Sequence, residues 1–198
     1  MIPKAPLYLA LLHYPVYNAH GQMVCTSITP FDLHDIARTV KTYGLSGYFV
    51  VCPVESQRLL AQKILDHWLT GVGGELNQTR KDAFASLRLV ATLEEAEACI
   101  RSESGSAPHL IATSAKPGRN RISFAVGRDR LAEGPHPHLL LFGTGWGMAQ
   151  ELLDRCHGIL EPIVGGGDGS YNHLPVRAAV AIILDRLLSA PSPVDLSI

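Results

Sequence analysis

The sequence predicts an α/β fold with a doubly wound, mainly parallel sheet, and three observations lead to this class. Short apolar runs such as residues 139–142 are bounded by glycine, as buried strands are. Segments with helical spacing alternate with these runs, which favours strand–helix–strand units and parallel strands. Two glycine-rich loops follow neighbouring predicted strands near the C-terminus. The carboxyl edge of such a sheet is where ligands bind.

Composition fits one domain that spans residues 1–198 and excludes several classes of protein. The 17 basic and 18 acidic residues give a net charge of −1, so any contact with RNA must come from a local basic patch. The four cysteines are scattered without a C-x-x-C pair, so we expect reduced thiols and no metal site. No apolar run has the length of a membrane span, and no signal peptide is evident. We therefore expect a cytoplasmic protein without a membrane partner.

The first elements are a strand over residues 8–12, a polar and turn-rich excursion, and a helix. His13 and Tyr14 end the strand, where half-buried residues are a more ordinary interpretation than catalytic ones. Thr29 and Pro30 predict the start of the helix, with Thr29 as N-cap and proline in the first turn. Gly44 predicts its left-handed end. The side chains expected to face the core are Phe31, Ile36, Val40 and Tyr43.

The middle of the chain also alternates between predicted strands and predicted helices. We expect strands at 47–51, 87–91 and 109–113, and helices at 56–69, within 77–86 and from Leu93. The helix over 56–69 has an apolar face of Leu59, Leu60, Ile64 and Trp68. Thr92 and Glu95 have the spacing of a capping box at the start of the last helix.

Residues 116–130 form the most basic segment. Two interpretations remain open, a solvated loop and a surface that follows an RNA backbone, where each phosphate contact adds salt-dependent affinity. The candidate RNA-binding residues are Lys116, Arg119, Arg121 and Arg128. Residues 190–198 are rich in proline and serine, and we expect a disordered tail.

The C-terminal part contains two strand–loop–helix units. The expected elements are strands at 139–142 and 158–164 and helices at 148–156 and 176–188. The loop GTGWGM begins like a dinucleotide-binding fingerprint, but Met148 is too bulky for its third glycine position. Glu161 lies at a distance suited to a ribose-binding acid, so a nucleotide-dependent oxidoreductase remains an alternative. No GK[ST] tripeptide follows a glycine run, which excludes a Walker-type phosphate loop.

Three segments resemble, in order, the motifs of the SPOUT superfamily of RNA methyltransferases. They are LHDIARTVKTYGLSGYFVV at 33–51, LLLFGTGWGM at 139–148, and ILEPIVGGGDGSYNHLPVRAAVAIILDRLL at 159–188. The resemblance covers essentially the whole chain and is nearest to an uncharacterised bacterial family related to tRNA m1G-methyltransferases. It implies a trefoil knot and a donor site within about 109–189. It also implies a homodimer packed through the knot region.

The resemblance further implies S-adenosylmethionine (SAM) as methyl donor and a tRNA or rRNA substrate, methylated on base or ribose. Backbone N–H and C=O groups at strand ends can hold an adenine. The expected donor-binding residues are Thr113, Ser114, Phe142, Gly143, Thr144, Gly145, Leu160, Pro162, Ile163, Gly165, Tyr171, Asn172, His173, Leu174 and Val176. For Asn172 and His173 an alternative role as N-cap of the following helix stays open.

Four residues are candidates for the chemistry. Arg38 matches an arginine that acts on the RNA-facing side of the superfamily's active site, although periodicity alone suggests an ordinary solvated arginine. A guanidinium stays charged, so Arg38 would hold a phosphate or a developing negative charge. Asp32, Asp35 or His173 could accept a proton. Asp32 stands where the superfamily has asparagine, which puts the ribose hydroxyl in doubt as target and keeps a non-catalytic SAM- or RNA-binding module as an alternative.

Overall fold

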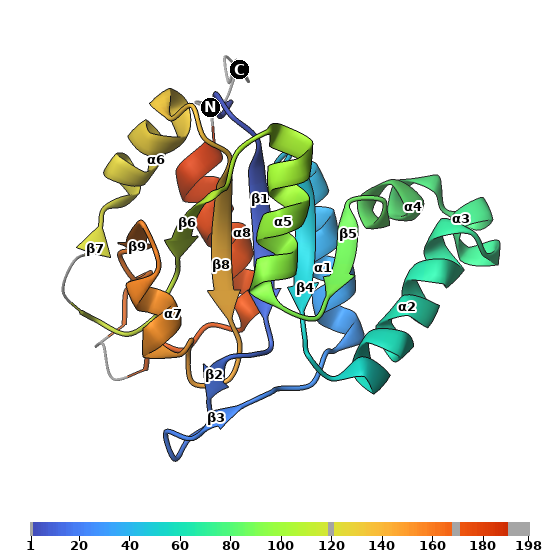
Figure 1. Cartoon of the computed structure of the whole chain (residues 1–198), viewed down its shortest axis with the longest axis horizontal. Coiled ribbons are helices and arrows are strands. Elements are labelled where there is room, and N and C mark those ends of the chain that lie inside the picture. Colours follow the sequence, from blue (N-terminus) through green and yellow to red (C-terminus); the bar gives the residue numbers. More distant parts are fainter. Residues whose placement is uncertain (1, 119–120, 168–170, 190–198) are drawn as a thin grey trace, which may run out of the picture.

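Seven strands form the central sheet of the computed structural model, which describes residues 2–118, 121–167 and 171–189 (Figure 1). The order is β5-β4-β1-β8-β6-β9-β7, and each neighbouring pair is parallel, as predicted. These strands are β1 Leu7–Leu12, β4 Gly47–Val51, β5 Leu87–Val90, β6 His109–Ala112, β7 Arg121–Ile122, β8 His138–Gly143 and β9 Gly158–Leu160. A small antiparallel pair, β2 Val16–Tyr17 and β3 Met23–Val24, occupies the excursion after β1.

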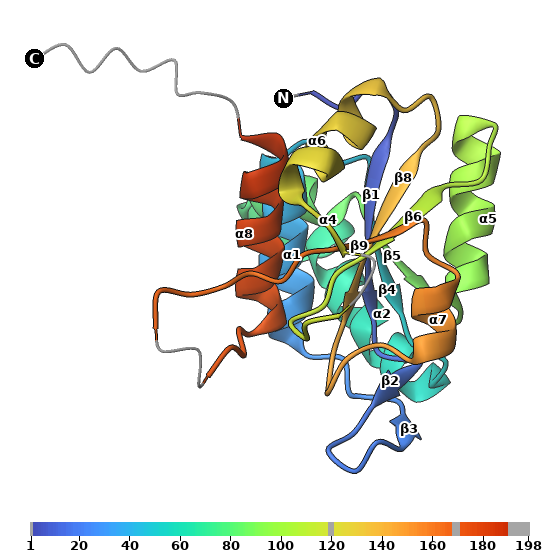
Figure 2. The ribbon, with the colours of Figure 1, turned by 90° about the vertical axis from the view of Figure 1, so that its left-hand side faces the viewer.

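Helices cover both faces of the sheet, which confirms the doubly wound arrangement. Figure 2 shows α1 and α8 on one side of the sheet and α5 and α7 on the other. Helices α2, α4 and α6 pack into the same core as α1 and α8. The helices are α1 Pro30–Thr42, α2 Glu55–Leu69, α3 Val72–Leu76, α4 Gln78–Phe84, α5 Leu93–Ser104, α6 Phe124–Glu133, α7 Gln150–Asp154 and α8 Val176–Leu188.

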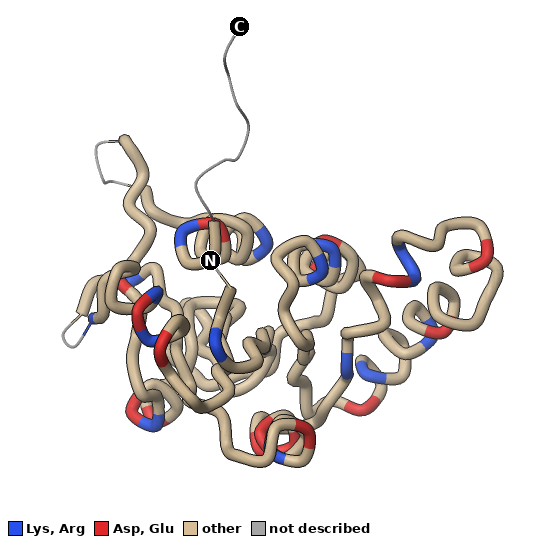
Figure 3. Tube along the Cα trace, turned by 90° about the horizontal axis from the view of Figure 1, so that it is seen from above, with Lys and Arg blue, Asp and Glu red and all other residues tan. Residues whose placement is uncertain are grey.

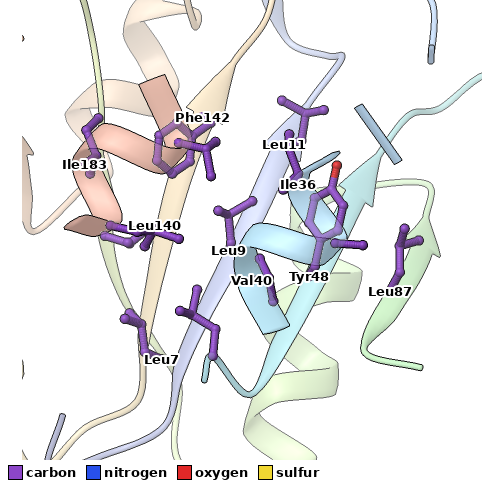
Figure 4. Packing of buried hydrophobic residues seen from close by; sticks show 14 of the residues in the cluster. Leu7, Leu9, Leu11, Ile36, Val40, Tyr48, Leu87, Leu140, Phe142 and Ile183 are labelled. Carbon is purple, nitrogen blue, oxygen red and sulfur yellow. The ribbon is translucent and has the colours of Figure 1, made fainter. Parts of the chain in front are cut away.

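The central strand β1 divides the core in two because successive side chains of a strand point to opposite faces. Leu9 and Leu11 pack toward α1 and α8, together with Phe142 and Ile183 (Figure 4). Tyr8, Ala10 and Leu12 point to the opposite face and pack toward α5 and α7. A parallel strand covered on both faces is apolar throughout, which is why the sequence of β1 has no polar alternation.

The start and end of α1 follow the sequence prediction. The hydroxyl of Thr29 accepts a hydrogen bond from the amide of Asp32 at 3.2 Å, and Gly44 has φ +70°. The expectation for Phe31 is wrong, because its ring is exposed. The buried stripe of α1 includes Leu33 and Ile36, and Phe31 lies about 200° around the helix from Leu33.

The predicted core face of α2 is also partly wrong. Leu59 and Leu60 are exposed, and Ala61 and Leu65 are the buried residues of this helix. The reason is the position of α2, which packs against α3, α4 and the edge strand β5 instead of lying across the sheet (Figure 1). A helix at the edge needs only a narrow apolar strip.

Three further expectations need correction. The helix expected over 148–156 is only α7, because Met148 pairs with Val16 in a β-bridge and Ala149 is extended. The strand expected over 158–164 stops at Leu160, two residues before Pro162, which has no N–H to donate to a ladder. The basic segment is not simply a loop, since it holds β7 and α6. The predicted disordered tail lies outside the described residues.

The charges are mixed over the surface. Figure 3 shows basic and acidic positions interspersed along the trace, with neither sign gathered on one side of this view. Within the described ranges, none of the helices is both long and apolar enough to cross a membrane.

Candidate functional site

A cavity of about 600 Å³ opens where β6, β8 and β9 end and α8 begins. Its walls come from residues 113–116 after β6, 142–148 at the end of β8, Glu161 and Ile163 after β9, and 171–176 before α8. The segments are far apart in sequence and meet because parallel strands end at the same edge of the sheet. This is the edge where the sequence predicts a ligand.

Twelve of the fifteen expected donor-binding residues line this cavity. They are Thr113, Ser114, Phe142, Gly143, Thr144, Gly145, Ile163, Tyr171, Asn172, His173, Leu174 and Val176. Leu160, Pro162 and Gly165 are not among the lining residues. Leu160 belongs instead to the hydrophobic core, where it packs with α6 and α8.

Nine further lining residues were not among the expected donor-binding residues: Ala115, Lys116, Trp146, Gly147, Met148, Glu161, Pro175, Ala179 and Ile183. Helical spacing could have found two of them, because Ala179 and Ile183 follow Val176 by three and seven residues on one face of α8. Trp146 lies between Gly145, which is an expected donor-binding residue, and Gly147. Its position in the glycine loop could therefore have identified it as a lining residue.

The glycine loop after β8 brings bare backbone to the cavity. Gly145 and Gly147 have φ of +58° and +107°, where residues with a Cβ are strained. A Cβ on Gly145 would lie 2.8 Å from the carbonyl oxygen of Tyr17. The loop is held to β2 by two hydrogen bonds of 2.9 Å, from Trp146 N–H to Tyr17 C=O and from Tyr17 N–H to Gly147 C=O.

A chain of side-chain hydrogen bonds runs behind this loop. Nδ1 of His13 lies 3.0 Å from the Thr26 hydroxyl, which is bonded to the Thr144 hydroxyl. Thr144 in turn donates to the carbonyl of Leu12 at 3.0 Å. His13 is fully buried, not half-buried as expected, and its Nε2 has no partner within the described part of the chain. Burial lowers the pKa of His13 to about 4, against the opposing charge of Asp32, so the ring is neutral near pH 7.

One acid and one base contribute charge to the cavity wall. Oε1 of the half-buried Glu161 accepts a hydrogen bond from the amide of Phe124 at 2.8 Å. The Lys116 side chain is exposed. Water screens the exposed charge of Lys116 more than the half-buried carboxylate of Glu161.

The segment before α8 has no side-chain cap. The N-cap of α8 is Pro175, and no side chain accepts a hydrogen bond there. The alternative role of Asn172 and His173 as helix caps is therefore wrong, and both line the cavity instead. The dinucleotide fingerprint also lacks its helix, because Met148 and Ala149 are extended before α7 begins.

Of the four candidate catalytic residues, His173 lines the cavity and the three on α1 do not. Asp32 and Asp35 are both engaged by Arg177. Nη1 of Arg177 donates to the Asp35 carboxylate at 2.9 Å, and its Nε lies 3.6 Å from the Asp32 carboxylate. Arg38 is exposed on α1, which packs beside α8.

The candidate RNA-binding residues have different surroundings. Arg121 is half-buried and donates to the carbonyl of Lys116 at 2.7 Å, and burial lowers the pKa of its guanidinium. Arg128 donates to the carbonyl of Arg186 at 2.7 Å across α6 and α8. Lys116 is exposed beside the cavity, and Arg119 lies outside the described residues. Among the residues that the structure describes, no group of three or more His, Cys, Asp or Glu is placed to hold a metal ion.

Comparison with known proteins gives a family model, described as SAM-dependent RNA methyltransferase, that matches residues 6–189. A tRNA (guanine-N(1)-)-methyltransferase of Oleidesulfovibrio alaskensis is 47% identical over 186 residues, which are 94% of this chain and 43% of that protein. An uncharacterised protein of Aquifex aeolicus is 40% identical over 92% of this chain and 88% of its own length. This chain thus spans less than half of the first relative.

The fold also resembles solved structures. TrmJ from Z. mobilis superimposes with a TM-score of 0.59 over 94% of this chain and 70% of that chain, at 16% sequence identity. At this level of identity the likeness concerns the fold alone.

Proposed function

The chain belongs to the family of SAM-dependent RNA methyltransferases, and on that premise we propose that it transfers a methyl group from SAM to a nucleotide of RNA. The observation that carries the proposal is the convergence of four loop segments on one cavity at the carboxyl edge of the sheet. We propose the SPOUT type for this enzyme, with a trefoil knot in the region of β8, β9 and α8. Transfer RNA is the first substrate to test, since the relative from O. alaskensis carries a tRNA methyltransferase name.

The cavity suits SAM in size and in chemistry. A volume of about 600 Å³ lies within the range of roughly 300–1,000 Å³ that small-molecule sites occupy. Gly143 and Gly145 have no side chains over their main-chain N–H and C=O groups, and such groups can hold an adenine. Phe142, Ile163 and Val176 provide apolar walls. The half-buried carboxylate of Glu161 favours a cationic ligand, and SAM carries a sulfonium.

When bound, SAM supplies an electrophilic methyl group on sulfur, and the residues of the chain supply position and proton transfer. Holding both reactants in line can contribute roughly 7–11 kcal/mol of the barrier. We propose that His173 accepts the proton of the acceptor, because it lines the cavity and its ring is exposed. Asp32 and Asp35 are paired with Arg177, so they would act by fixing α8 against α1.

The RNA would lie over basic residues of the segment 116–130, which begins beside the cavity. Lys116 is next to the donor site, and Arg119, Arg121 and Arg128 belong to the same segment. We propose that Arg38 holds a phosphate from its exposed position on α1. A homodimer packed through the knot region would bring a second surface of this kind to the site. Such an enzyme would act in the cytoplasm, where tRNA is present.

The acceptor atom is open between a base nitrogen and a ribose hydroxyl. The guanine-N1 name describes the whole relative, of which the match covers 43%. Asp32, which stands where the SPOUT superfamily has asparagine, weakens the case for ribose. Mass spectrometry of nucleosides from a deletion strain and its parent would identify the atom as the modification that disappears.

Calorimetry with SAM in chelator-treated buffer tests the donor site, and tritium transfer from labelled SAM to total tRNA and rRNA tests the reaction. We expect saturable heat and incorporation that decreases in Arg38→Ala and His173→Ala. Leu76→Ala, which changes an exposed side chain on the outlying α3, serves as control. Binding without transfer to either RNA would identify a non-catalytic SAM-binding module, and absence of binding would reject the proposal.

A further inference from the structure

Trp146 stands at the mouth of the cavity with an exposed ring and a fixed backbone. Its side chain is 54% exposed, although large aromatic side chains are mostly buried on average. Hydrogen bonds with Tyr17 hold the main chain at Trp146 and at Gly147. The left-handed conformations of Gly145 and Gly147 set the turn on either side. The indole is therefore exposed to solvent on a loop whose backbone is held by hydrogen bonds.

Two further rings continue from Trp146 along the rim. The indole and the His173 imidazole have centroids 6.3 Å apart with planes at 60°, so their contact is an edge contact. His173 and Tyr171 are 5.3 Å apart at 69°, and Tyr171 is 78% exposed. All three residues also line the cavity. An exposed aromatic rim next to a ligand cavity is typical of a recognition surface.

A cation lies beside this rim. The position that a Cβ on Gly147 would take is 3.9 Å from Nζ of Lys116, so the ammonium is adjacent to the residue that follows Trp146. Lys116 is exposed and lines the same cavity. An aromatic face with a neighbouring cation matches one nucleotide, which offers a flat base and a phosphate. Proteins that bind single-stranded RNA combine these two features.

We propose that Trp146 is the stacking platform for an unpaired base of the RNA substrate, with Lys116 on the adjoining phosphate. The inference rests on the proposed function and extends it, because it assigns a substrate-recognition residue and a substrate class, a nucleotide outside a double helix. A base within a helix is stacked on both sides and cannot lie on the indole, so enzymes that modify bases act on loops or extruded nucleotides.

Fluorescence tests the contact directly, independently of methyl transfer. The chain has two tryptophans, and Trp68→Phe leaves Trp146 as the only tryptophan. This variant, saturated with S-adenosylhomocysteine so that the donor site is filled, is titrated with the single-stranded pentanucleotide of uridine. We expect saturable quenching, weaker in Lys116→Ala. Absence of quenching at concentrations where tRNA is methylated would overturn the proposal.

Kinetics of two variants provide the second test. Trp146→Ala should raise the KM for tRNA by roughly 5- to 150-fold, the range expected for loss of one stacked base, while the Kd for SAM stays within about 3-fold. Trp146→Phe retains a ring and should recover most of the loss. Leu76→Ala removes an exposed apolar side chain on α3 and should leave both constants unchanged.

The other outcomes separate this inference from the proposed function. Loss of SAM binding in Trp146→Ala would place the indole in the donor site. Dissociation of an oligomer of this variant in sedimentation would make the rim a self-association surface. Either result overturns the stacking role. Normal methylation by Trp146→Ala overturns it as well and leaves the proposed function standing. If the pentanucleotide quenches the fluorescence but the wild type does not methylate RNA, the stacking role of Trp146 stands and the proposed methyltransferase activity is rejected.

Discussion

Arg177 donates a hydrogen bond to the carboxylate of Asp35 at 2.9 Å, and the two residues are 142 positions apart in the sequence. The same guanidinium lies 3.6 Å from Asp32 and over the ring of Phe31 at 5.3 Å from its centroid. Arg177 thus ties the first turn of α8, which lines the cavity, to the first turns of α1. The exposed ring of Phe31 and the two acids at the start of α1 therefore all contact one arginine.

Replacing Arg177 by alanine should lower the free energy of unfolding by about 1 kcal/mol, as expected for partly exposed ion pairs. Urea denaturation measures the loss. A double-mutant cycle with Asp35→Asn should give a coupling energy of about 0.5–1 kcal/mol. Additive effects of the two substitutions would contradict a stabilising contact between them.

Gly145→Ala should distort the loop after β8. The added Cβ would sit 2.8 Å from a backbone oxygen that cannot move aside, in a left-handed conformation that costs about 1–2 kcal/mol for alanine. We expect SAM to bind at least about 10-fold more weakly, since each 1.4 kcal/mol is tenfold. The matched control is Gly166→Ala, where no atom lies within 4 Å of the new Cβ. Equal SAM affinity of the two variants in calorimetry would refute the assigned role of the loop.

Thr26→Val tests the hydrogen-bond chain behind the loop. Valine has the shape of threonine but leaves His13 and Thr144 without their shared partner, which costs about 1–3 kcal/mol for buried groups. Thr42→Val is the control, because Thr42 is exposed and water can replace its bond to the carbonyl of Arg38. Urea denaturation of both variants should show a clearly larger loss for Thr26→Val. A similar small loss of stability in both variants would mean that the hydrogen-bond chain contributes little to stability.

Acid should destabilise the protein through His13. Its pKa is about 4 in the folded protein and about 6.5 when unfolded, so the unfolded state binds more protons between these values. Stability is therefore fully present above about pH 6.5 and is lost as the pH falls toward 4, by up to about 3 kcal/mol. Burial lowers the pKa of His138 in the same direction, to about 4.

The measurement is urea denaturation at several pH values for the wild type and for His13→Gln, which cannot titrate in this range. The variant should be less stable at pH 7 but lose less stability on acidification. Parallel pH profiles would show that His13 is not the source of the acid sensitivity.

Lys116→Ala should change the salt dependence of RNA binding. Removing one contact with a phosphate lowers the slope of log affinity against log salt by about 0.7 for a single strand. Lys63→Ala, at an exposed position on α2, serves as control for the loss of a positive charge. Filter binding of tRNA between low and physiological salt gives the slopes. An unchanged slope for Lys116→Ala would place the phosphate contact elsewhere.

The sequence by itself determined the α/β class, the edge of the sheet at which the cavity opens and most of the residues that line it. Short apolar runs predict buried strands, and the Thr29–Pro30 start and Gly44 end of α1 are local signals that act within one turn. Loops after neighbouring parallel strands must meet at one edge. For this reason twelve expected donor-site residues, Gly143 and Asn172 among them, line one cavity.

Only the tertiary structure decided which side chains of those loops reach the cavity and which are engaged elsewhere. Periodicity gives a face of a helix but not its neighbour. Leu59 and Leu60 were therefore assigned to a core that α2, at the edge of the sheet, enters through Ala61 and Leu65 instead. The pairing of Arg177 with Asp35 and the bonds that fasten Trp146 to Tyr17 join residues more than a hundred positions apart. No local pattern encodes such contacts, because they depend on how strands order themselves in the sheet.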